Sequence, residues 1–414
     1  MTQSDSIVVT GIGVLSPLGI GLEEFWKGLI RGDCGVKRVT HFPVDNEIYR
    51  CKIASEVPKF DPQPWIQKDD PALEGRYARL ALSAAGMSLR DAGLLAHEDL
   101  LQSVDLFVGS AQETGDTLES QIESWLRNPK LPLSPNTLDR IDPHAVTQAL
   151  SRNFMIGGRV ESLSCSCTSG ILALMLCICK IQTGRSKMGL VIGADTISPL
   201  TFMGEGLTGE LAKRNDDPAH ASRPFDRDQD GYVIGEGAVA FMVETRSHAQ
   251  ARGSRIYAEF GPMAANNDAT SFKYIDEEGN QFSRCHAMVL TKVPPERIDY
   301  INVHGPSIKA LDRAESKAIR KAFGSHADRI PVSSIKGAIG NPSAAGSMLQ
   351  ITSAILAIRD GVIPHTLNLK NPLPGCDLNY VCDEPLHQAV KTVLISAHGG
   401  GGLNASLTIY PGPA

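Results

Sequence analysis

The stretch that decides the fold is residues 162–179, which read SLSCSCTSGILALMLCIC. A short segment rich in Ser and Thr ends at Gly170 and gives way to an apolar run with no polar face until Lys180. Ser, Thr and Gly at such a junction are typical of a strand that turns sharply into a helix. A helix that is apolar all round is buried. We therefore predict a buried central helix with Cys167 at its N-terminal end.

The position of Cys167 favours a nucleophile, because the unpaired N–H groups and the dipole at a helix N-terminus stabilise a thiolate. A lone cysteine is also among the residues most often buried for packing alone, and this stretch by itself leaves that interpretation open. Cys165 is the competing thiol. It lies on the strand side of the junction, where we expect it to be buried and inert.

The composition is that of an ordinary globular protein. The chain has 414 residues, of which 42% are hydrophobic and 21% are charged, so we expect two to three structural units. The formal charge of -6 and the pI near 6.0 argue against a broad nucleic-acid-binding surface, although they are compatible with a local basic patch for an acidic partner. No apolar run is long and charge-free enough for insertion into a membrane.

The nine cysteines indicate a cytoplasmic protein with reduced thiols, because their number is odd and no secretory signal opens the sequence. Cys177 and Cys179 would point apart on a helix, and no His cluster follows them, so we predict no zinc site. The aspartates within residues 226–230 copy the start of a calcium loop, but Gly237 stands where the closing Glu should fall. We therefore expect no bound metal.

Strand and helix patterns alternate in both halves of the chain, which predicts a layered α/β architecture. The first strand, Ile7–Thr10, leads into a Gly-rich stretch at residues 11–19 that we interpret as a turn. This stretch resembles a dinucleotide fingerprint, but Ser16 replaces the third Gly, so we do not predict NAD binding. In the second half, one strand runs into a turn at His304, and the strand at residues 393–397 runs into a Gly-rich loop. Turns at strand ends are where open α/β folds build their sites.

Several motifs in order along the chain resemble those of the β-ketoacyl synthases of the elongating type, within the thiolase-like superfamily. The resemblance covers nearly the whole chain. The matching segments are the opening at residues 9–13 and 16–19, the nucleophile motif at residues 167–170, the middle signature at residues 223–226, 230–231 and 235–237, the histidine motif at His304 and Gly305 with Asp312 and Glu315, the lysine motif at residues 333–336 with Gly340, and the Gly-rich loop at Gly401, Gly402 and Asn404.

The resemblance implies a duplicated thiolase-like fold of five layers, α-β-α-β-α. It implies that residues 1–252 form the half that carries the nucleophile, and that residues 253–414 form the half that carries the His, Lys, Asn and Gly-rich loop. It also implies acyl carrier protein as a partner, and a homodimer or a heterodimer with a related ketosynthase chain. No resident cofactor is expected, because the phosphopantetheine arm of the carrier protein brings the substrate.

The resemblance further implies an acyltransferase. The Cys167 thiolate would attack an acyl thioester, and backbone N–H groups of Cys167 and Gly400 would stabilise the tetrahedral oxyanion. His304 would hold the carbonyl of a malonyl thioester, whose decarboxylation supplies the carbanion. Lys336 would add positive charge that supports the thiolate.

The chain departs from the family at the second catalytic histidine, whose position is Asn341 when counted from Lys336. An amide can donate a hydrogen bond to a developing enolate, but it does not change protonation state near pH 7. A Cys-His-Asn set occurs in the related initiating synthases. Asn341 is equally compatible with a simple turn former before Pro342, so both interpretations stay open.

Other positions also differ from the family pattern. Gly400 replaces a gatekeeping Phe, which would open the pocket and free the loop. His398 replaces a nearby Phe, and it is either a relocated acid/base or simply a loop residue. The remaining departures are Pro306 and Ile308 in place of two Thr, and Gln350 at the position of the Glu that pairs with the Lys.

Three hypotheses from different classes follow. The first, which we adopt, is a synthase that condenses an unusual acyl group with a malonyl-type extender in polyketide or specialised fatty-acid biosynthesis. The second is an acyl transferase that loads Cys167 and passes the acyl group on without decarboxylation. The third is a chain-length-factor-like partner that shapes the cavity of an active ketosynthase.

Overall fold

The computed structural model describes residues 5–113, 115–130, 137–142, 144–271 and 275–413. Its main sheet is mixed and has two halves, which meet where Ile7–Val9 pair antiparallel with Ala258–Phe260. Two further sheets within the described residues have two strands each. The order in the first half is β1 (Ile7–Ser16), β8 (Gly237–Thr245), β7 (Met188–Asp195), β5 (Asp105–Gly109) and β6 (Val160–Leu163). The order in the second half is β9 (Ala258–Asn267), β15 (Leu403–Pro411), β14 (Val393–Gly399), β10 (Tyr300–Asn302) and β11 (Val332–Ser333).

The two halves repeat one topology. In each half, the strand that comes first in sequence, β1 or β9, lies at the junction, and the strand that comes last, β8 or β15, pairs with it antiparallel. The third strand in the order, β7 or β14, is antiparallel to that last strand. The two outermost strands of each half are parallel to their neighbours. The same order in both halves confirms the predicted duplication.

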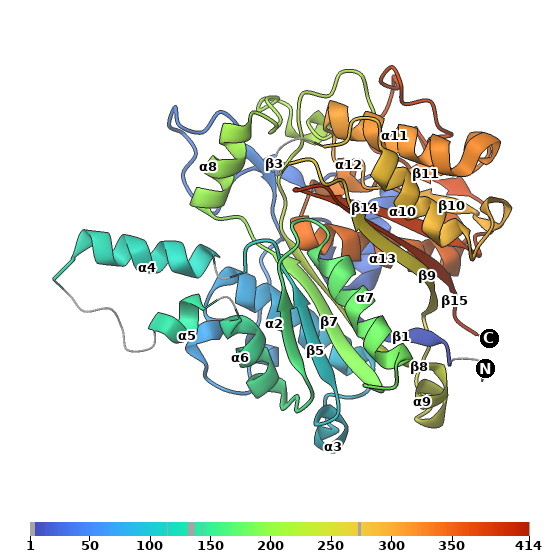
Figure 1. Ribbon diagram of the computed structural model, residues 1–414. Helices are drawn as coiled ribbons and strands as arrows, with labels where there is room; N and C mark the ends of the chain where they lie inside the picture. Colours follow the sequence, from blue (N-terminus) through green and yellow to red (C-terminus); the bar gives the residue numbers. More distant parts are fainter. Residues whose placement is uncertain (1–4, 114, 131–136, 143, 272–274, 414) are drawn as a thin grey trace.

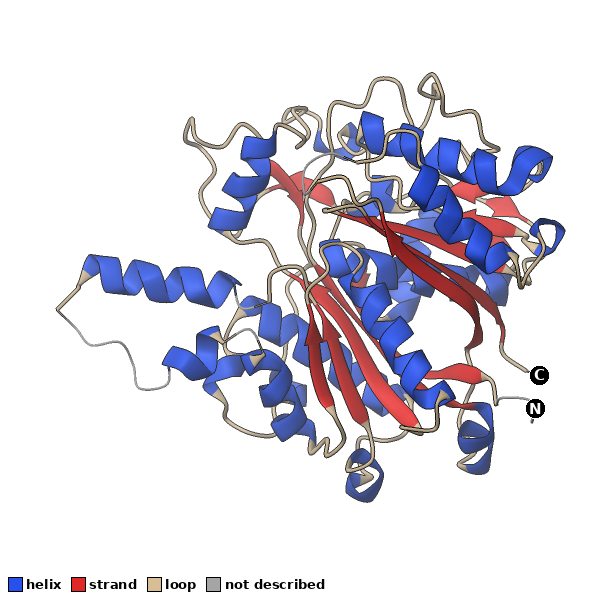
Figure 2. Ribbon diagram, viewed as in Figure 1, coloured by secondary structure: helices blue, strands red, loops and turns tan. Residues whose placement is uncertain are grey.

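The helices complete the layers (Figures 1 and 2). On the outer faces, α2 (Arg76–Asp91) packs on β1, β7 and β8, whereas α10 (Asn280–Leu290) packs on β9 and β15 and contacts α11 (Lys309–Phe323). Between the two half-sheets lie α7 (Ser169–Gln182) and α13 (Ser343–Asp360), which contact each other. Since α13 contacts β7 and β8 of one half and β14 and β15 of the other, the predicted five layers are confirmed.

The remaining elements are short and lie around this core. The helices are α1 (Leu22–Arg31), α3 (Glu98–Leu101), α4 (Gly115–Arg127), α5 (Thr137–Ile141), α6 (Ala145–Phe154), α8 (Pro199–Thr208), α9 (Arg246–Ala251) and α12 (Lys336–Ile339). The strands are β2 (Gly19–Ile20), β3 (Val36–Arg38), β4 (Ile53–Ser55), β12 (Val362–Ile363) and β13 (Leu386–His387). In the part of the chain that the structure describes, no helix is both long and apolar enough to cross a membrane.

The prediction of a Gly-rich turn after Thr10 is wrong for residues 11–16, which continue β1. The glycines serve packing there. A Cβ on Gly13 would overlap the carbonyl oxygen of Ala84, and a Cβ on Gly11 would lie 2.8 Å from the Cβ of Ala92. Glycine at both positions therefore lets α2 lie directly on the strand, which no turn signal in the sequence could reveal.

The predicted helix is confirmed as α7, but it is not buried on every side, because Leu172, Met175 and Leu176 are half-buried and Cys179 is exposed. Its close contact with α13 also depends on glycine. A Cβ on Gly170 would lie 2.7 Å from the Cγ of Met348, and a Cβ on Gly193 of β7 would lie 2.6 Å from the same atom. The hydroxyl of Ser347 accepts a hydrogen bond from the N–H of Ile171 at 3.2 Å. A Cβ on Gly170 would also lie 2.4 Å from the carbonyl oxygen of Ala344, so the backbones of the two helices approach closely at their N-terminal ends.

Gly170→Ala should destabilise the protein by about 1–3 kcal/mol, because the added methyl group overpacks the α7–α13 contact. Urea unfolding of the purified variant measures this as a lower midpoint. Gly204→Ala is the matched control, since Gly204 lies inside α8 and a Cβ there would meet no atom within 4 Å. Equal midpoints for the Gly170 variant and the wild type would contradict the proposed close approach.

Candidate active site

Cys167 lies in a tight turn between β6 and α7. Ser166, the residue before it, adopts a left-handed backbone with φ of +53°, which is unusual for a side chain other than Gly. The turn is tied by the Ser169 hydroxyl, which accepts from the Cys165 N–H at 2.7 Å and donates to the Ser166 carbonyl at 2.6 Å. Because α7 begins at Ser169, the Cys167 sulfur stands just before the first turn of the helix, as the sequence predicted.

The four cysteines of this region differ in exposure and chemistry. Cys167 is half-buried, and so is Cys165, which we had expected to be buried. Burial nevertheless raises the pKa of Cys165, which disfavours its thiolate. Cys177 is buried and Cys179 exposed, so the two thiols do point apart on α7. All nine cysteines lie among the described residues and each is a free thiol.

Asn341 is the side chain that meets the nucleophile. Its Nδ2 lies 3.6 Å from Sγ of Cys167, close enough for an N–H···S hydrogen bond. The backbone of Asn341 is anchored on both sides, because its N–H donates to the Val233 carbonyl at 2.7 Å and its carbonyl accepts from the Gly235 N–H at 3.0 Å. Asn341 therefore does more than form a turn before Pro342: it holds an amide against the sulfur.

His304 is buried and paired with Lys336, whose Nζ lies 2.7 Å from Nδ1 of the imidazole. Burial lowers the pKa of His304 well below its usual value, and the positive charge of Lys336 lowers it further. The imidazole is therefore neutral near pH 7. Since the ammonium donates to Nδ1, the proton of the ring is on Nε2, which makes that atom a hydrogen-bond donor.

Lys336 is the buried cation of the site. Burial lowers its pKa to about 8, and the negative charges of Cys167 and Glu315 oppose that shift. Because a charge interaction is mutual, the ammonium stabilises a Cys167 thiolate in return. The Glu315 carboxylate also fixes the turn, since it accepts from the N–H groups of His304 and Gly305, both at 2.8 Å.

His398 lies beside His304, with ring centroids 6.2 Å apart and the rings edge to face. Its Nδ1 is 2.8 Å from Oδ1 of Asn404, whose Nδ2 donates to Asp268 at 2.7 Å. That second bond orients the amide, so Nδ1 of His398 carries the ring proton. Nε2 is then an acceptor, and it is buried with no hydrogen-bond partner among the described residues. Burial lowers the pKa of His398, so the neutral ring offers a lone pair rather than an acid.

The Gly400 N–H, which we predicted as an oxyanion donor, is engaged in this structure. It donates to Oγ of Ser166 at 3.0 Å, and Oγ lies 3.9 Å from the Cys167 sulfur. A Cβ on Gly400 would lie 3.1 Å from Oγ of Ser166. The Gly-rich loop therefore contacts the turn that carries Cys167. The Ser166 hydroxyl must move away before the Gly400 N–H can bind an oxyanion.

Gln350 and Asp226, two positions that the motifs singled out, have structural roles. The Gln350 amide donates to the carbonyl of Ser396 at 3.1 Å and to that of Asn302 at 3.3 Å, inside the core. Asp226 accepts from the backbone N–H groups of residues 370 and 371, both at 2.8 Å.

In the described ranges, no group of three or more His, Cys, Asp or Glu side chains is arranged to hold a metal ion.

Two family models match this chain in sequence. The model described as "Beta-ketoacyl synthase, N-terminal domain" matches residues 4–249, and the model described as "Beta-ketoacyl synthase, C-terminal domain" matches residues 257–370. The chain belongs to the β-ketoacyl synthase family. It is an acyl-transferring enzyme of this family, as the sequence motifs implied.

Similar proteins support this assignment over the full length. The chain is 33% identical to "3-oxoacyl-[acyl-carrier-protein] synthase 2" of Coxiella burnetii, over 97% of this chain and 98% of the relative. A structure titled "The ishigamide ketosynthase/chain length factor" superposes with a TM-score of 0.91 at 28% identity, covering 99% and 100% of the two chains. A type II polyketide synthase ketosynthase, bound to its acyl-carrier protein and to a hexaketide, superposes with a TM-score of 0.90 at 26% identity, also covering 99% and 100%.

Two features of the synthase site lay beyond sequence reasoning. The first is the Ser166 hydroxyl between Gly400 and the nucleophile, because no pattern in the sequence signals a left-handed backbone at a serine. The second is the pair of hydrogen bonds that the Glu315 carboxylate accepts from the backbone of the turn at His304. Glu315 stood in a recognised motif, but only the folded chain brings its carboxylate to the backbone of residues eleven and ten positions earlier.

The pKa of Lys336 predicts a pH limit on acylation of Cys167. Lys336 is charged below about pH 8 and neutral above it, so its support for the thiolate is lost as the pH rises through that value. We expect the rate of Cys167 acylation, followed by intact mass from pH 6 to 10, to level off or fall above about pH 8. In Lys336→Met this alkaline loss should be absent and the rate lower throughout. A wild-type rate that climbs steadily to pH 10 would contradict the assignment.

Proposed function

We propose that this β-ketoacyl synthase condenses an acyl group, held as a thioester on Cys167, with a malonyl-type extender delivered by acyl carrier protein. The observation that carries the proposal is the contact of the Asn341 amide with the Cys167 sulfur, 3.6 Å apart, at the N-terminus of a buried helix. A thiolate there has a hydrogen-bond donor from the other half of the chain beside it. The solved complex of a similar ketosynthase with its carrier protein supports the choice of partner.

In the first step, the Cys167 thiolate attacks the carbonyl of an acyl thioester carried on the phosphopantetheine arm. The C–S bond to the arm breaks, and the arm leaves as a thiolate that takes a proton from solvent. Backbone N–H groups of Cys167 and, once Ser166 has moved, of Gly400 would stabilise the oxyanion. The product is acyl-Cys167, and no resident cofactor is needed.

In the second step, the malonyl thioester loses carbon dioxide, and the electron pair of the broken C–C bond moves into an enolate. The enolate carbon attacks the acyl-Cys167 carbonyl, a new C–C bond forms, and the Cys167 thiolate leaves. His304 would donate from Nε2 and Asn341 from Nδ2 to the enolate oxygen. Both groups are neutral hydrogen-bond donors, so Asn341 would donate to the enolate oxygen in the place of a second neutral imidazole.

We propose that the protein forms a dimer with a second copy of itself or with a related ketosynthase chain. In this dimer, the partner would cover two features of the first half of the chain. One is β6, which lies at the edge of the sheet with its outer backbone groups unpaired within the sheet order. The other is α4, which projects from the body in Figure 1 and exposes Leu118, Ile122, Trp125 and Leu126. An edge strand and an apolar helix face both favour burial against another chain. The resemblance to a ketosynthase/chain length factor pair supports the heterodimer as the alternative to a homodimer.

The pathway we propose is polyketide or specialised fatty-acid biosynthesis in the cytoplasm. The site departs from the pattern of the general elongating synthases at Asn341, His398 and Gly400, and nine free thiols suit a reducing compartment. Co-expression with candidate ketosynthase-like chains, followed by purification, would identify a partner of the heterodimer.

Cys167→Ala should abolish acyl transfer to the enzyme, because no other thiol stands at the helix N-terminus with a donor beside it. The measurement is intact mass after incubation with acyl-carrier-protein thioesters. Cys165→Ser is the matched control, and it should load as the wild type does. Equal loading of the wild type and Cys167→Ala would refute the proposal.

Asn341→Ala should separate the two steps. Loading of Cys167 should change by no more than about twofold, whereas condensation should fall by about 10²–10³ because one donor to the enolate oxygen is gone. Release of labelled carbon dioxide from malonyl carrier protein, together with product mass, measures the second step. Wild-type enzyme that loads but never releases carbon dioxide would instead be a non-decarboxylating acyl transferase, and enzyme that never loads would be a chain-length-factor-like partner.

A further inference from the structure

Ser166 places a hydroxyl between the nucleophile and the Gly-rich loop. Its Oγ accepts a hydrogen bond from the Gly400 N–H at 3.0 Å and lies 3.9 Å from the Cys167 sulfur. A hydroxyl has one hydrogen to donate and lone pairs that accept. Since a lone pair takes the Gly400 N–H, the hydrogen of the hydroxyl is available to the sulfur. Ser166 therefore contacts both an expected oxyanion donor and the atom that becomes a thiolate.

The backbone of Ser166 indicates that its side chain has a use. The φ of +53° is left-handed, a conformation that glycine adopts freely and serine adopts only at a cost in free energy. The Ser166 carbonyl helps to hold this conformation, because it accepts from the Ser169 N–H at 3.0 Å and from the Ser169 hydroxyl at 2.6 Å. A glycine would make both of these bonds without strain. What serine adds at this position is the pair of side-chain contacts.

The Gly-rich loop can adjust at Gly400 while its next residue stays anchored. The carbonyl of Gly401 accepts from the Asn267 side chain at 2.9 Å. Gly400 itself is exposed, and its N–H is held by Ser166. Because residues 399–402 are all glycine, a peptide group among them can rotate with little steric resistance. The Gly400 N–H can thus turn from the Ser166 hydroxyl to another acceptor without a large movement of the loop.

The charge on Cys167 decides how strongly the hydroxyl is held at the sulfur. A thiolate attracts the hydroxyl hydrogen, and a hydrogen bond to a charged group is about twice as strong as one between neutral groups. Once Cys167 is acylated, its sulfur belongs to a neutral thioester and is only a weak acceptor. The attraction is then lost, while the acyl carbonyl brings a new acceptor to the site. The Gly400 N–H is free to bind that oxygen only after the Ser166 hydroxyl has left it.

We infer that Ser166 is a positioning residue that couples the charge of Cys167 to the oxyanion donor of Gly400. While Cys167 is a thiolate, the hydroxyl donates to the sulfur and occupies the Gly400 N–H. When the acyl group arrives, the hydroxyl turns away and the N–H passes to the acyl oxygen. The inference rests on the proposed loading of Cys167, and it adds no bond-making step to that reaction. Loading must therefore break one hydrogen bond that a variant without the hydroxyl lacks.

The test compares two reactions of Cys167 in the same protein. Iodoacetamide alkylates the thiolate at a saturated carbon, so this reaction needs no oxyanion donor. Octanoyl carrier protein acylates the same thiolate through a tetrahedral oxyanion, so this reaction needs one. Both rates are measured by intact mass at one pH. The ratio of the acylation rate to the alkylation rate cancels the thiolate fraction and any misfolded share of the protein.

Ser166→Gly and Ser166→Ala both lack the hydroxyl, and the glycine variant also lacks the backbone strain. We expect each variant to raise the ratio about three- to tenfold, because loading no longer breaks the hydrogen bond to Gly400. The midpoint pH of alkylation should move upward, since the thiolate has lost a donor. A residue that only shapes the turn would move neither quantity in this direction.

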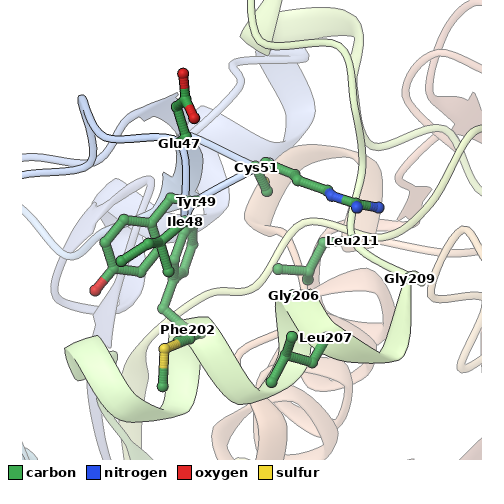
Figure 3. Close-up of a pocket in the computed structure, with 11 residues that line it drawn as sticks. Glu47, Ile48, Tyr49, Cys51, Phe202, Gly206, Leu207, Gly209 and Leu211 are labelled. Carbon is green, nitrogen blue, oxygen red and sulfur yellow. The ribbon is translucent and has the colours of Figure 1, made fainter.

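Two control variants should keep the wild-type ratio. Ser164→Ala removes an exposed hydroxyl from the same segment, and that hydroxyl donates to the Ala111 carbonyl at 3.4 Å. Leu207→Ala shortens an exposed side chain at a cavity of about 400 Å³ between α8 and residues 47–51 (Figure 3). The residues that line this cavity do not include Cys167.

A crystal structure of the wild-type enzyme acylated by octanoyl carrier protein, without extender, tests the geometry directly. We expect the Gly400 N–H to bind the acyl oxygen of octanoyl-Cys167. The Ser166 oxygen should then lie beyond hydrogen-bond distance from that N–H, whereas the two are 3.0 Å apart in the unloaded enzyme.

Three outcomes would overturn the inference. The first is a ratio in both Ser166 variants that equals or falls below that of the wild type, and a lower ratio would mean that the hydroxyl itself serves the oxyanion. The second is an alkylation midpoint that does not rise in either variant. The third is an octanoyl enzyme in which Ser166 still holds the Gly400 N–H. All three leave acylation of Cys167, and hence the proposed function, intact. If neither octanoyl nor any other acyl group is transferred to Cys167 of the wild type, the proposed function fails, and this inference fails with it.

Discussion

The structure depends on one close contact, that between the first turns of α7 and α13. Gly170 lacks the side chain that would meet Met348, and Ser347 takes up the N–H of Ile171 at 3.2 Å. Both helices begin at the same place between the two half-sheets. Cys167 precedes one helix and Asn341 precedes the other, so this contact joins a nucleophile from the first half of the chain to an amide from the second.

The buried charges around this contact explain why an amide serves beside the thiol. Lys336 is the buried cation, and burial together with its positive charge keeps His304 neutral. With its proton on Nε2, His304 is a donor that does not change its charge. Asn341 offers the same property through a different side chain. In the proposed reaction, these two neutral donors would stabilise the enolate oxygen.

In the proposed reaction, His304 and Asn341 would present hydrogen-bond donors to the carbonyl that reacts. Glu315 and Ser166 act through others: the carboxylate fixes the turn of His304, and the hydroxyl holds the Gly400 N–H at 3.0 Å until the loop moves. The proposed chemistry thus depends on hydrogen bonds whose direction is set by the fold.

The sequence by itself determined the layered α/β class, the apolar helix after Cys167 and the order of the motifs, because hydrophobic periodicity and local turn residues are properties of neighbours in the chain. It misjudged residues 11–16 as a turn, since the glycines there make room for α2, a partner more than sixty positions away. It likewise left open whether Asn341 forms a turn or meets the thiol. Only the tertiary structure decided this, and it also placed Glu315 on the His304 turn. These contacts join residues far apart in sequence, and their geometry is fixed only when the two halves pack.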